Sequence, residues 1–262
     1  MTARASVAEG PPLLTRQSEG RATLTLNRPS HLNRLHREDL LALQDHIATL
    51  AADPSLRVVV LTGSGRAFCA GFNLQELQQP GSGASDPQLF ERSVDALEAL
   101  PVPTIARLNG SVFGGATDLA LACDFRVGVA GMELRMPAAR LGLHYYPSGL
   151  QRYVSRLGLS AAKRLFLLAE TVGDAELLRL GYLDALALAN GLDQAVEQIA
   201  QSLLQGAPLA LRGMKLSLND VARGAVDLQL LQERERASAD SADLREGLAA
   251  FAERRAPRFS GR

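Results

Sequence analysis

Cysteine, excess positive charge and long apolar runs are all scarce in this sequence, and each absence narrows the class of protein. Only two of the 262 residues are cysteines, Cys69 and Cys123, which excludes a disulfide framework and favours a reducing, cytoplasmic location. Lysine plus arginine and aspartate plus glutamate both number 28, so no basic excess would attract nucleic acid. No apolar run approaches the roughly 18 residues of a membrane span, so we expect no membrane partner.

The spacing of the hydrophobic residues, which make up 47% of the chain, predicts an α/β protein with a large core. Alternating or continuous β-branched patterns predict strands in four segments, 22–26, 58–61, 104–108 and 125–129. Helical spacing or composition predicts helices over 40–50, 88–100 and 116–123. The composition of residues 78–87 is typical of a mobile loop, which could gate a pocket.

The last third of the chain is expected to be helical and to take part in assembly. Strand patterns end near residue 193, and helices are predicted over 193–205, 208–222, 225–237 and 240–255. Their apolar faces are too large for isolated helices to bury, so we expect them to dock on the core or on another subunit. We therefore divide the chain into a lead-in over 1–20, a core over 21–200 and a helical oligomerisation region over 201–262.

Glycine-rich turns follow two of the predicted strands. Gly63 and Gly65 suggest a dinucleotide fingerprint, but Phe68 occupies the third glycine position, so a tight turn with positive φ is favoured. Small residues also occupy 69–71 and 114–115, beside the ends of two strands. Backbone N–H groups can approach a ligand closely at such places, and two of them can polarise one carbonyl group.

Together these motifs resemble the enoyl-CoA hydratase/isomerase (crotonase) superfamily. The resemblance is carried by residues 27–29, 59–63, 66–71, 109–110, 114–115, 118–120, 123–124, 141–142, 207–208, 215, 246–247, 250–251 and 254–255. It implies a spiral of ββα units with a C-terminal helical trimerisation region, a homotrimer or dimer of trimers, and an acyl-CoA thioester substrate. No cofactor is implied, because coenzyme A is part of the substrate. No metal is expected, since the remaining histidines show no ligand spacing.

By the same resemblance, the backbone N–H groups of Ala70 and Gly115 form an oxyanion hole around the thioester oxygen. If Gly115 begins the helix that follows, its N–H is among the unpaired donors of a helix N-terminus, where the peptide dipoles favour negative charge. Loss of one such donor typically costs about 3 kcal/mol, or on the order of a hundredfold in rate.

Asp118 lies three residues after Gly115, so helical geometry brings its carboxyl within about one turn of the proposed hole. We take it as the candidate acid/base, although hydratases of the family usually carry Glu there. Ala138 occupies the position at which hydratases carry their second catalytic Glu. A methyl group moves no protons, so the resemblance implies a divergent hydratase rather than an ordinary one.

Aromatic residues after Leu141 suggest other reactions. His144, Tyr145 and Tyr146 are expected to face the same pocket and to supply titratable or hydrogen-bonding groups, and we take His144 and Tyr145 as further catalytic candidates. Packing in the core or at an interface is the alternative for all three rings. Tyr145 also resembles a tyrosine of the decarboxylase branch that lies near the substrate carboxylate, which makes decarboxylation of a malonyl-type thioester the alternative. A non-catalytic acyl-CoA-binding protein is a third hypothesis, motivated by Ala138.

Several residues are expected to bind coenzyme A or shape the acyl pocket. Those expected at coenzyme A are Arg66, Phe68, Lys215, Phe251 and Arg254, the last two supplied by a neighbouring subunit according to the resemblance. Isolated surface cations are usually only solvated, which is the alternative for these arginines and the lysine. According to the resemblance, Phe72 and Asn73 stand where many members of the family have Ala and Asp, so we expect a different acyl pocket.

Overall fold

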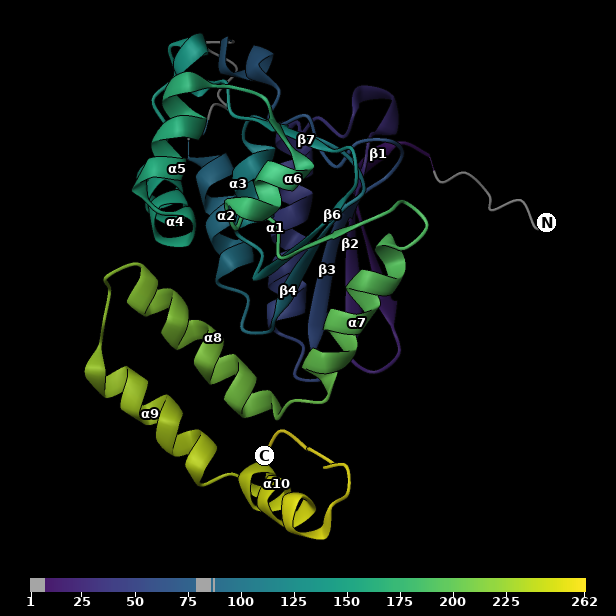
Figure 1. The fold of residues 1–262 in the computed structure, drawn as a ribbon, viewed down its shortest axis with the longest axis vertical. Helices are drawn as coiled ribbons and strands as arrows, with labels where there is room; N and C mark the ends of the chain where they lie inside the picture. Colours follow the sequence, from purple (N-terminus) through teal and green to yellow (C-terminus); the bar gives the residue numbers. More distant parts are fainter. Residues whose placement is uncertain (1–7, 79–85, 87) are drawn as a thin grey trace, which may run out of the picture.

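A six-stranded sheet forms the centre of the protein, for which the computed structural model describes residues 8–78, 86 and 88–262 (Figure 1). Its strands lie in the order β1 (Gly10–Gln17), β2 (Arg21–Asn27), β3 (Val58–Gly63), β4 (Thr104–Leu108), β6 (Phe125–Val129) and β9 (Ala185–Ala187). β1 runs antiparallel to β2, and every other neighbouring pair is parallel. A second sheet has the order β5 (Val112–Phe113), β7 (Glu133–Arg135) and β8 (Val172–Gly173).

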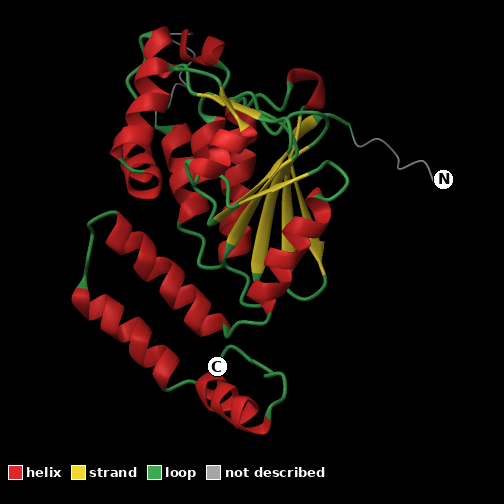
Figure 2. Ribbon diagram, viewed as in Figure 1, coloured by secondary structure: helices red, strands yellow, loops and turns green. Residues whose placement is uncertain are grey.

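Helices cover both faces of the large sheet, as expected for parallel strands (Figure 2). Successive residues of β3 alternate between two cores: Val59 and Leu61 face α1, whereas Val58 faces α7. The helices before the C-terminal region are α1 (Arg37–Ala51), α2 (Leu89–Glu98), α3 (Ala116–Leu121), α4 (Pro147–Leu157), α5 (Leu159–Lys163), α6 (Asp174–Arg179) and α7 (Leu192–Leu204). Short 3-10 turns span Pro29–His31, Leu74–Gln78 and Ala138–Leu141, and a π-helical turn spans Arg164–Leu168.

Residues 10–17 of the expected lead-in form a strand of the large sheet. β1 forms a hairpin with β2, in which Leu14 pairs with Leu24 and packs against the main core. His46 of α1 also makes a hydrogen bond through Nε2 to the Pro12 carbonyl oxygen, at 2.9 Å. The boundary at residue 20 therefore separates two strands that the structure joins. Most of the loop predicted over 78–87 lies outside the described residues.

The C-terminal helices extend away from the sheet (Figure 1). They are α8 (Pro208–Ala222), α9 (Leu228–Ala239) and α10 (Ala242–Glu253), close to the predicted ranges. Many of their apolar side chains are exposed, with Phe251 at 85%. No helix of the described chain is long and apolar enough to cross a lipid bilayer.

Candidate active site

A cavity of about 900 Å³ opens between the segment that follows β3, the turn that follows β5 and the N-terminus of α4. It is larger than two other cavities of the described chain, which have volumes of about 490 and 290 Å³. Five aromatic residues line it, namely Phe72, Phe90, Phe113, Tyr145 and Tyr146. The turn residues Ala70, Gly71, Gly114 and Gly115 line it too.

Two glycine turns meet at the wall of this cavity because neither carries side chains at the contact. Gly71 and Gly114 have left-handed φ values of +90° and +56°, which L side chains rarely adopt. A Cβ atom on Gly71 would lie 2.7 Å from the Phe113 carbonyl oxygen and 3.3 Å from the Gly115 nitrogen. The Phe113 N–H donates to the Cys69 carbonyl oxygen at 3.0 Å, which ties the two turns together. The backbone after Gly71 therefore lies next to the Gly115 amide.

The amide of Ala70 does not meet our expectation for the oxyanion hole. Its N–H donates to the carbonyl oxygen of Leu32 at 2.9 Å, so it is already paired within the protein. This interaction could not be foreseen from the sequence, because it depends on how residues 32–35 lie beside the turn.

Phe72 supplies the amide that Ala70 does not. Leu35 pairs with the residues on either side of it: the Leu35 N–H donates to Gly71 O at 2.9 Å, and its carbonyl accepts from Asn73 N at 2.8 Å. Phe72 lies between Gly71 and Asn73 in this parallel bridge, so its own N–H points away from Leu35. Among the hydrogen bonds of the described residues, the Phe72 and Gly115 amides have no acceptor.

Gly115 is placed as predicted, at the N-cap of α3, where the first amides of a helix lack intrahelical partners. The ring of Phe90 lies directly against it, since a Cβ atom on Gly115 would be 2.7 Å from Phe90 Cζ. The rings of Phe90 and Phe72 have centroids 6.1 Å apart. An apolar wall thus stands beside the two unpaired amides.

Asp118 does not reach the cavity, which contradicts the expectation that it acts on the substrate directly. Its side chain is fully buried on α3 and is not among the lining residues. Oδ2 accepts hydrogen bonds from Arg152 Nη1, at 2.7 Å, and from the Tyr146 hydroxyl. Burial raises the pKa of Asp118, although the Arg152 charge opposes this. The carboxylate is therefore sealed behind Tyr146.

No carboxylate without another partner lines the described wall of the cavity. Ala138 lines the cavity, so a methyl group occupies the place expected for the second Glu. The acidic residues that do line it, Glu76 and Asp86, are engaged elsewhere. Glu76 accepts from the Arg37 N–H at 2.9 Å and contacts His36 Nδ1 at 2.8 Å, whereas Asp86 pairs with Arg92.

The hydroxyls of Tyr145 and Tyr146 form a pair at the cavity wall. Their rings stack with centroids 4.3 Å apart, and the Tyr145 hydroxyl donates to the Tyr146 oxygen at 3.3 Å. Burial raises the pKa of both phenols above the usual tyrosine range, so both stay protonated at neutral pH. His144 also lines the cavity, with Nδ1 2.8 Å from the Tyr145 carbonyl oxygen. Tyr146 lines the cavity as expected, although the sequence did not mark it as a catalytic candidate.

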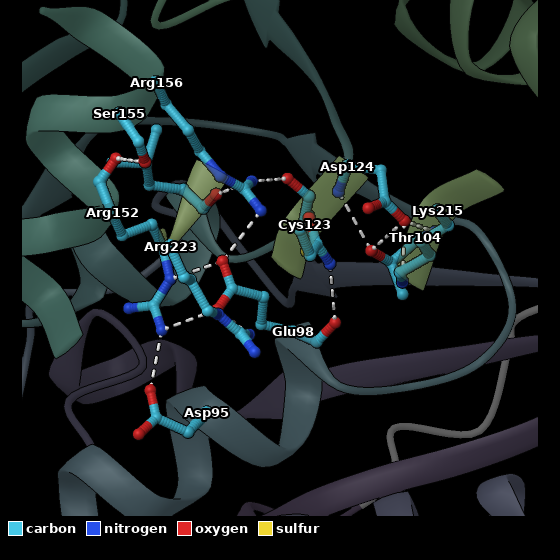
Figure 3. Close-up of polar contacts among 12 residues, drawn as sticks. Asp95, Glu98, Thr104, Cys123, Asp124, Arg152, Ser155, Arg156, Lys215 and Arg223 are labelled. Carbon is cyan, nitrogen blue, oxygen red and sulfur yellow. Dashed lines mark hydrogen bonds and ion pairs between the residues drawn. The ribbon is translucent and has the colours of Figure 1, made fainter. Parts of the chain in front are cut away.

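Two of the residues expected to bind coenzyme A are part of the protein interior instead. The side chain of Phe68 is fully buried in the core. Lys215 Nζ is buried and lies 2.8 Å from both Asp124 Oδ2 and the Val102 carbonyl oxygen (Figure 3). The helical pattern around Lys215 could not reveal these partners, because Asp124 and Val102 lie far away in the sequence.

The other three are not brought to the cavity within this chain. Arg66 is exposed and does not line it. Phe251 and Arg254 lie in or directly after α10, at the opposite end of the molecule from α4 and α5 (Figure 1). Their contribution from a neighbouring subunit stays a prediction.

Comparison with known proteins identifies the class that this fold and cavity represent. Residues 16–262 match the family model described as "Enoyl-CoA hydratase/isomerase". The chain is 32% identical over 245 residues to 2,3-dehydroadipyl-CoA hydratase of Escherichia coli, covering 91% of this chain and 94% of that protein. It is 29% identical over 256 residues to crotonyl-CoA hydratase of Syntrophomonas wolfei, covering 94% and 97% of the two chains.

Comparison with solved structures supports the same family. A crystal structure of an enoyl-CoA hydratase from Bacillus anthracis superposes with a TM-score of 0.87 and 28% identity, covering 97% of this chain and 100% of that one. The chain therefore belongs to the enoyl-CoA hydratase/isomerase family and has the crotonase-like α/β fold with a C-terminal helical region.

Proposed function

We propose that this chain is an enzyme that acts on an acyl-CoA thioester and stabilises an enolate with the amides of Phe72 and Gly115. Both amides border the large cavity, lack a protein acceptor among the described residues and lie on adjoining turns. A thioester oxygen that accepts both hydrogen bonds would gain most when it becomes negatively charged, because these donors are preorganised. Each donor of this kind contributes about 3 kcal/mol to the transition state.

Among reactions that pass through such an enolate, the cavity favours decarboxylation of a malonyl-type acyl-CoA. The observation that carries this proposal is that no carboxylate without another partner lines the described wall. Ala138 lines it and Asp118 is sealed off, whereas the lining acids Glu76 and Asp86 are bonded to other residues. Hydration by the family's usual route uses two carboxylates, one to activate water and one to handle the proton at carbon. Decarboxylation instead needs a group that takes up the electron pair of the breaking bond, and the thioester carbonyl does this when the two amides stabilise its oxygen.

The proposed reaction begins with the loss of CO₂ from the substrate. The bond between the α carbon and the substrate carboxylate breaks, CO₂ leaves, and the electron pair moves into the thioester to form the enolate that the two amides hold. A proton, ultimately from water, then adds to the α carbon and restores the thioester. Tyr145 supports this reaction, because its protonated hydroxyl can turn from the Tyr146 oxygen, 3.3 Å away, and donate its hydrogen to the substrate carboxylate before the bond breaks.

A panel of thioesters distinguishes the hypotheses. Purified protein is incubated with malonyl-CoA, methylmalonyl-CoA and crotonyl-CoA, and product masses are measured. We expect loss of CO₂ from a malonyl-type substrate. Gain of water by crotonyl-CoA, without CO₂ loss from the others, would identify a divergent hydratase. No change in any thioester, with binding retained, would identify a non-catalytic acyl-CoA-binding protein.

Substitution of Gly115 by alanine tests the amide pair within the same assay. The added methyl group would collide with the Phe90 ring and push it into the cavity. We expect kcat/KM to fall by about a hundredfold in Gly115→Ala, the cost of one misplaced donor. Gly173→Ala is the matched control, because a Cβ atom there meets nothing within 4 Å and the backbone φ is not positive. Equal activity of the two variants would remove Gly115 from the proposed mechanism.

A further inference from the structure

One arginine lines the large cavity, at the place where α1 begins. Arg37 is the first residue of α1 and is half-buried. It is the only lysine or arginine among the described residues that line this cavity. A cation that is partly removed from water without a fixed partner is costly, so the place favours an anion from outside the chain.

No carboxylate of the described chain pairs with the Arg37 guanidinium. The acids closest to it in the sequence or at the cavity are bonded to other side chains: Glu38 to Arg28, Glu76 to His36, and Asp86 to Arg92. Residues 1–7, 79–85 and 87, which lie outside the described ranges, include no aspartate or glutamate. The chain itself therefore supplies no counter-charge for Arg37.

The chain after Phe72 leads from the proposed amide pair to Arg37. Phe72 pairs with Leu35 in a parallel bridge. Two residues beyond Leu35, the Arg37 N–H donates to Glu76 Oε2 at 2.9 Å. Residues 72–76 therefore run beside residues 35–37, with the Phe72 amide at one end and Arg37 at the other.

A second segment of the cavity wall leads from Gly115 to the same arginine. The Phe90 ring lies against Gly115. Asp86 begins the turn before α2, which a backbone hydrogen bond to its carbonyl oxygen closes at 3.2 Å, so it lies about 5 Å, one helical turn, from Phe90. The hydrogen bond from Arg92 lowers the pKa of Asp86, and the nearby charge of Arg37 lowers it further. Both segments thus converge on Arg37.

Four large apolar residues of these two segments line the cavity, namely Phe72, Leu74, Leu89 and Phe90. The two phenylalanine rings have centroids 6.1 Å apart. Methylene groups of an acyl chain are buried favourably against such a surface, whereas the amides and phosphates of coenzyme A would lose hydration there. The acyl group, rather than the coenzyme, therefore suits the path towards Arg37.

We propose that Arg37 is a specificity-determining residue that binds a carboxylate at the far end of the acyl group. The substrates are then coenzyme A thioesters of dicarboxylic acids, because a guanidinium and a carboxylate can form two parallel, charge-assisted hydrogen bonds. This inference rests on the proposed function only in that the cavity holds the acyl group of a thioester. A carboxylate that leaves as CO₂ is a different one, next to the thioester.

Binding of matched thioesters tests the proposal without turnover. Glutaryl-CoA and pentanoyl-CoA differ only in a terminal carboxylate or methyl group, as do pimeloyl-CoA and heptanoyl-CoA. Their acyl chains span roughly 5 and 8 Å when extended, which brackets the path to Arg37. None carries the carboxylate that decarboxylation removes. Isothermal titration calorimetry gives the dissociation constants, and we expect the wild type to prefer the dicarboxylic member of at least one pair.

Arg37→Gln should abolish this preference. Affinity for the preferred dicarboxylic thioester should fall by about 10–100-fold, the loss of one hydrogen bond between charged groups, whereas affinity for its monocarboxylic match should change by less than about threefold. Arg37→Lys should recover part of the loss, since it keeps the charge but not the paired donors. The melting temperature should stay near that of the wild type, because no ion pair of the described chain is broken.

Arg179→Gln is the matched control. Arg179 is an exposed arginine of α6 that pairs with Glu176 and does not line the cavity, so all four affinities should be unchanged. Equal weakening of both members of each pair in Arg37→Gln would mean that this arginine binds a coenzyme A phosphate, which overturns the proposal. Unchanged affinity for both dicarboxylic thioesters overturns it too.

The binding measurements also separate this inference from the proposed reaction. If no thioester loses CO₂, decarboxylation is wrong, but a preference that depends on Arg37 still supports the carboxylate site. If CO₂ is released and Arg37→Gln changes none of the affinities, only the inference about Arg37 is wrong. A wild type that binds none of the four thioesters contradicts both proposals.

Discussion

At the scale of single residues, the arginines around Glu98 together affect the pKa of its carboxyl more than burial does. Burial alone would raise the pKa of its carboxyl, but hydrogen bonds and charges of the surrounding arginines lower it from 4.5 to about 2. A carboxyl whose pKa is lower in the folded state stabilises the protein above its unfolded pKa. That stabilisation is lost as the pH falls from about 4.5 towards 2.

We therefore predict that Glu98→Gln flattens the acid limb of the stability curve. The lowered pKa corresponds to about 3 kcal/mol that the wild type loses between pH 5 and pH 2 and the variant does not. Urea unfolding at intervals across this range measures it. The variant should be less stable at neutral pH and approach the wild type in acid; parallel curves would show that Glu98 does not carry this dependence.

The sequence predicts the positions of those site residues that depend only on spacing along the chain. Gly115 lies at the N-cap of α3 because helix geometry follows from neighbouring residues. The choice between Ala70 and Phe72 could not be made this way, since it depends on hydrogen bonds from Leu32 and Leu35. The burial of Asp118 depends on Arg152, 34 residues further along the chain, which no short motif reveals.

At the scale of elements, the hairpin of β1 and β2 protects the edge of the large sheet. Six pairs of residues join the two strands, and Leu14 adds apolar contact with the core. Without β1, the backbone of β2 would be an unpaired edge next to a buried strand, a site that favours aggregation.

We predict that a chain beginning at Ser18 is less stable than one beginning at Ala8. The lost strand pairing and packing should cost about 3 kcal/mol or more, which lowers the melting temperature by roughly 10 °C for a domain of this size. Thermal unfolding followed by circular dichroism measures the shift, and light scattering follows aggregation. Equal melting temperatures would mean that β1 is a dispensable lead-in after all.

Elements with a long, regular pattern were predictable, and short ones were not. α8 matches its predicted range of 208–222, and β3 and β4 were located from their apolar runs. β5 and β8 contain two residues each, too few to show a period. Such strands form because the rest of the chain brings their partners together, as β7 does for both.

At the scale of the whole molecule, the C-terminal helices leave apolar surface uncovered. Leu228, Leu248 and Phe251 are 69%, 63% and 85% exposed on α9 and α10. Exposed apolar patches of this kind mark interaction surfaces. We propose that a second and a third copy of this chain cover them, which agrees with the assembly implied by the sequence resemblance.

We predict a particle of three or six times 28.0 kDa in sedimentation velocity. Phe251→Asp should shift it towards the monomer, because a buried unpaired carboxylate destabilises an interface by several kcal/mol. Leu188→Asp is the matched control, an equally drastic change at a leucine that is 69% exposed outside the C-terminal helices. A monomeric wild type would refute the predicted assembly.

The groups proposed to hold the enolate belong to the peptide backbone, and this makes the chemistry hard to lose by mutation. Any side chain other than proline at position 72 keeps the same N–H group, so exchanges there alter which acyl groups fit while the anion-holding pair persists. Substrate preference can thus diverge by single amino-acid steps, with the reactive centre inherited intact.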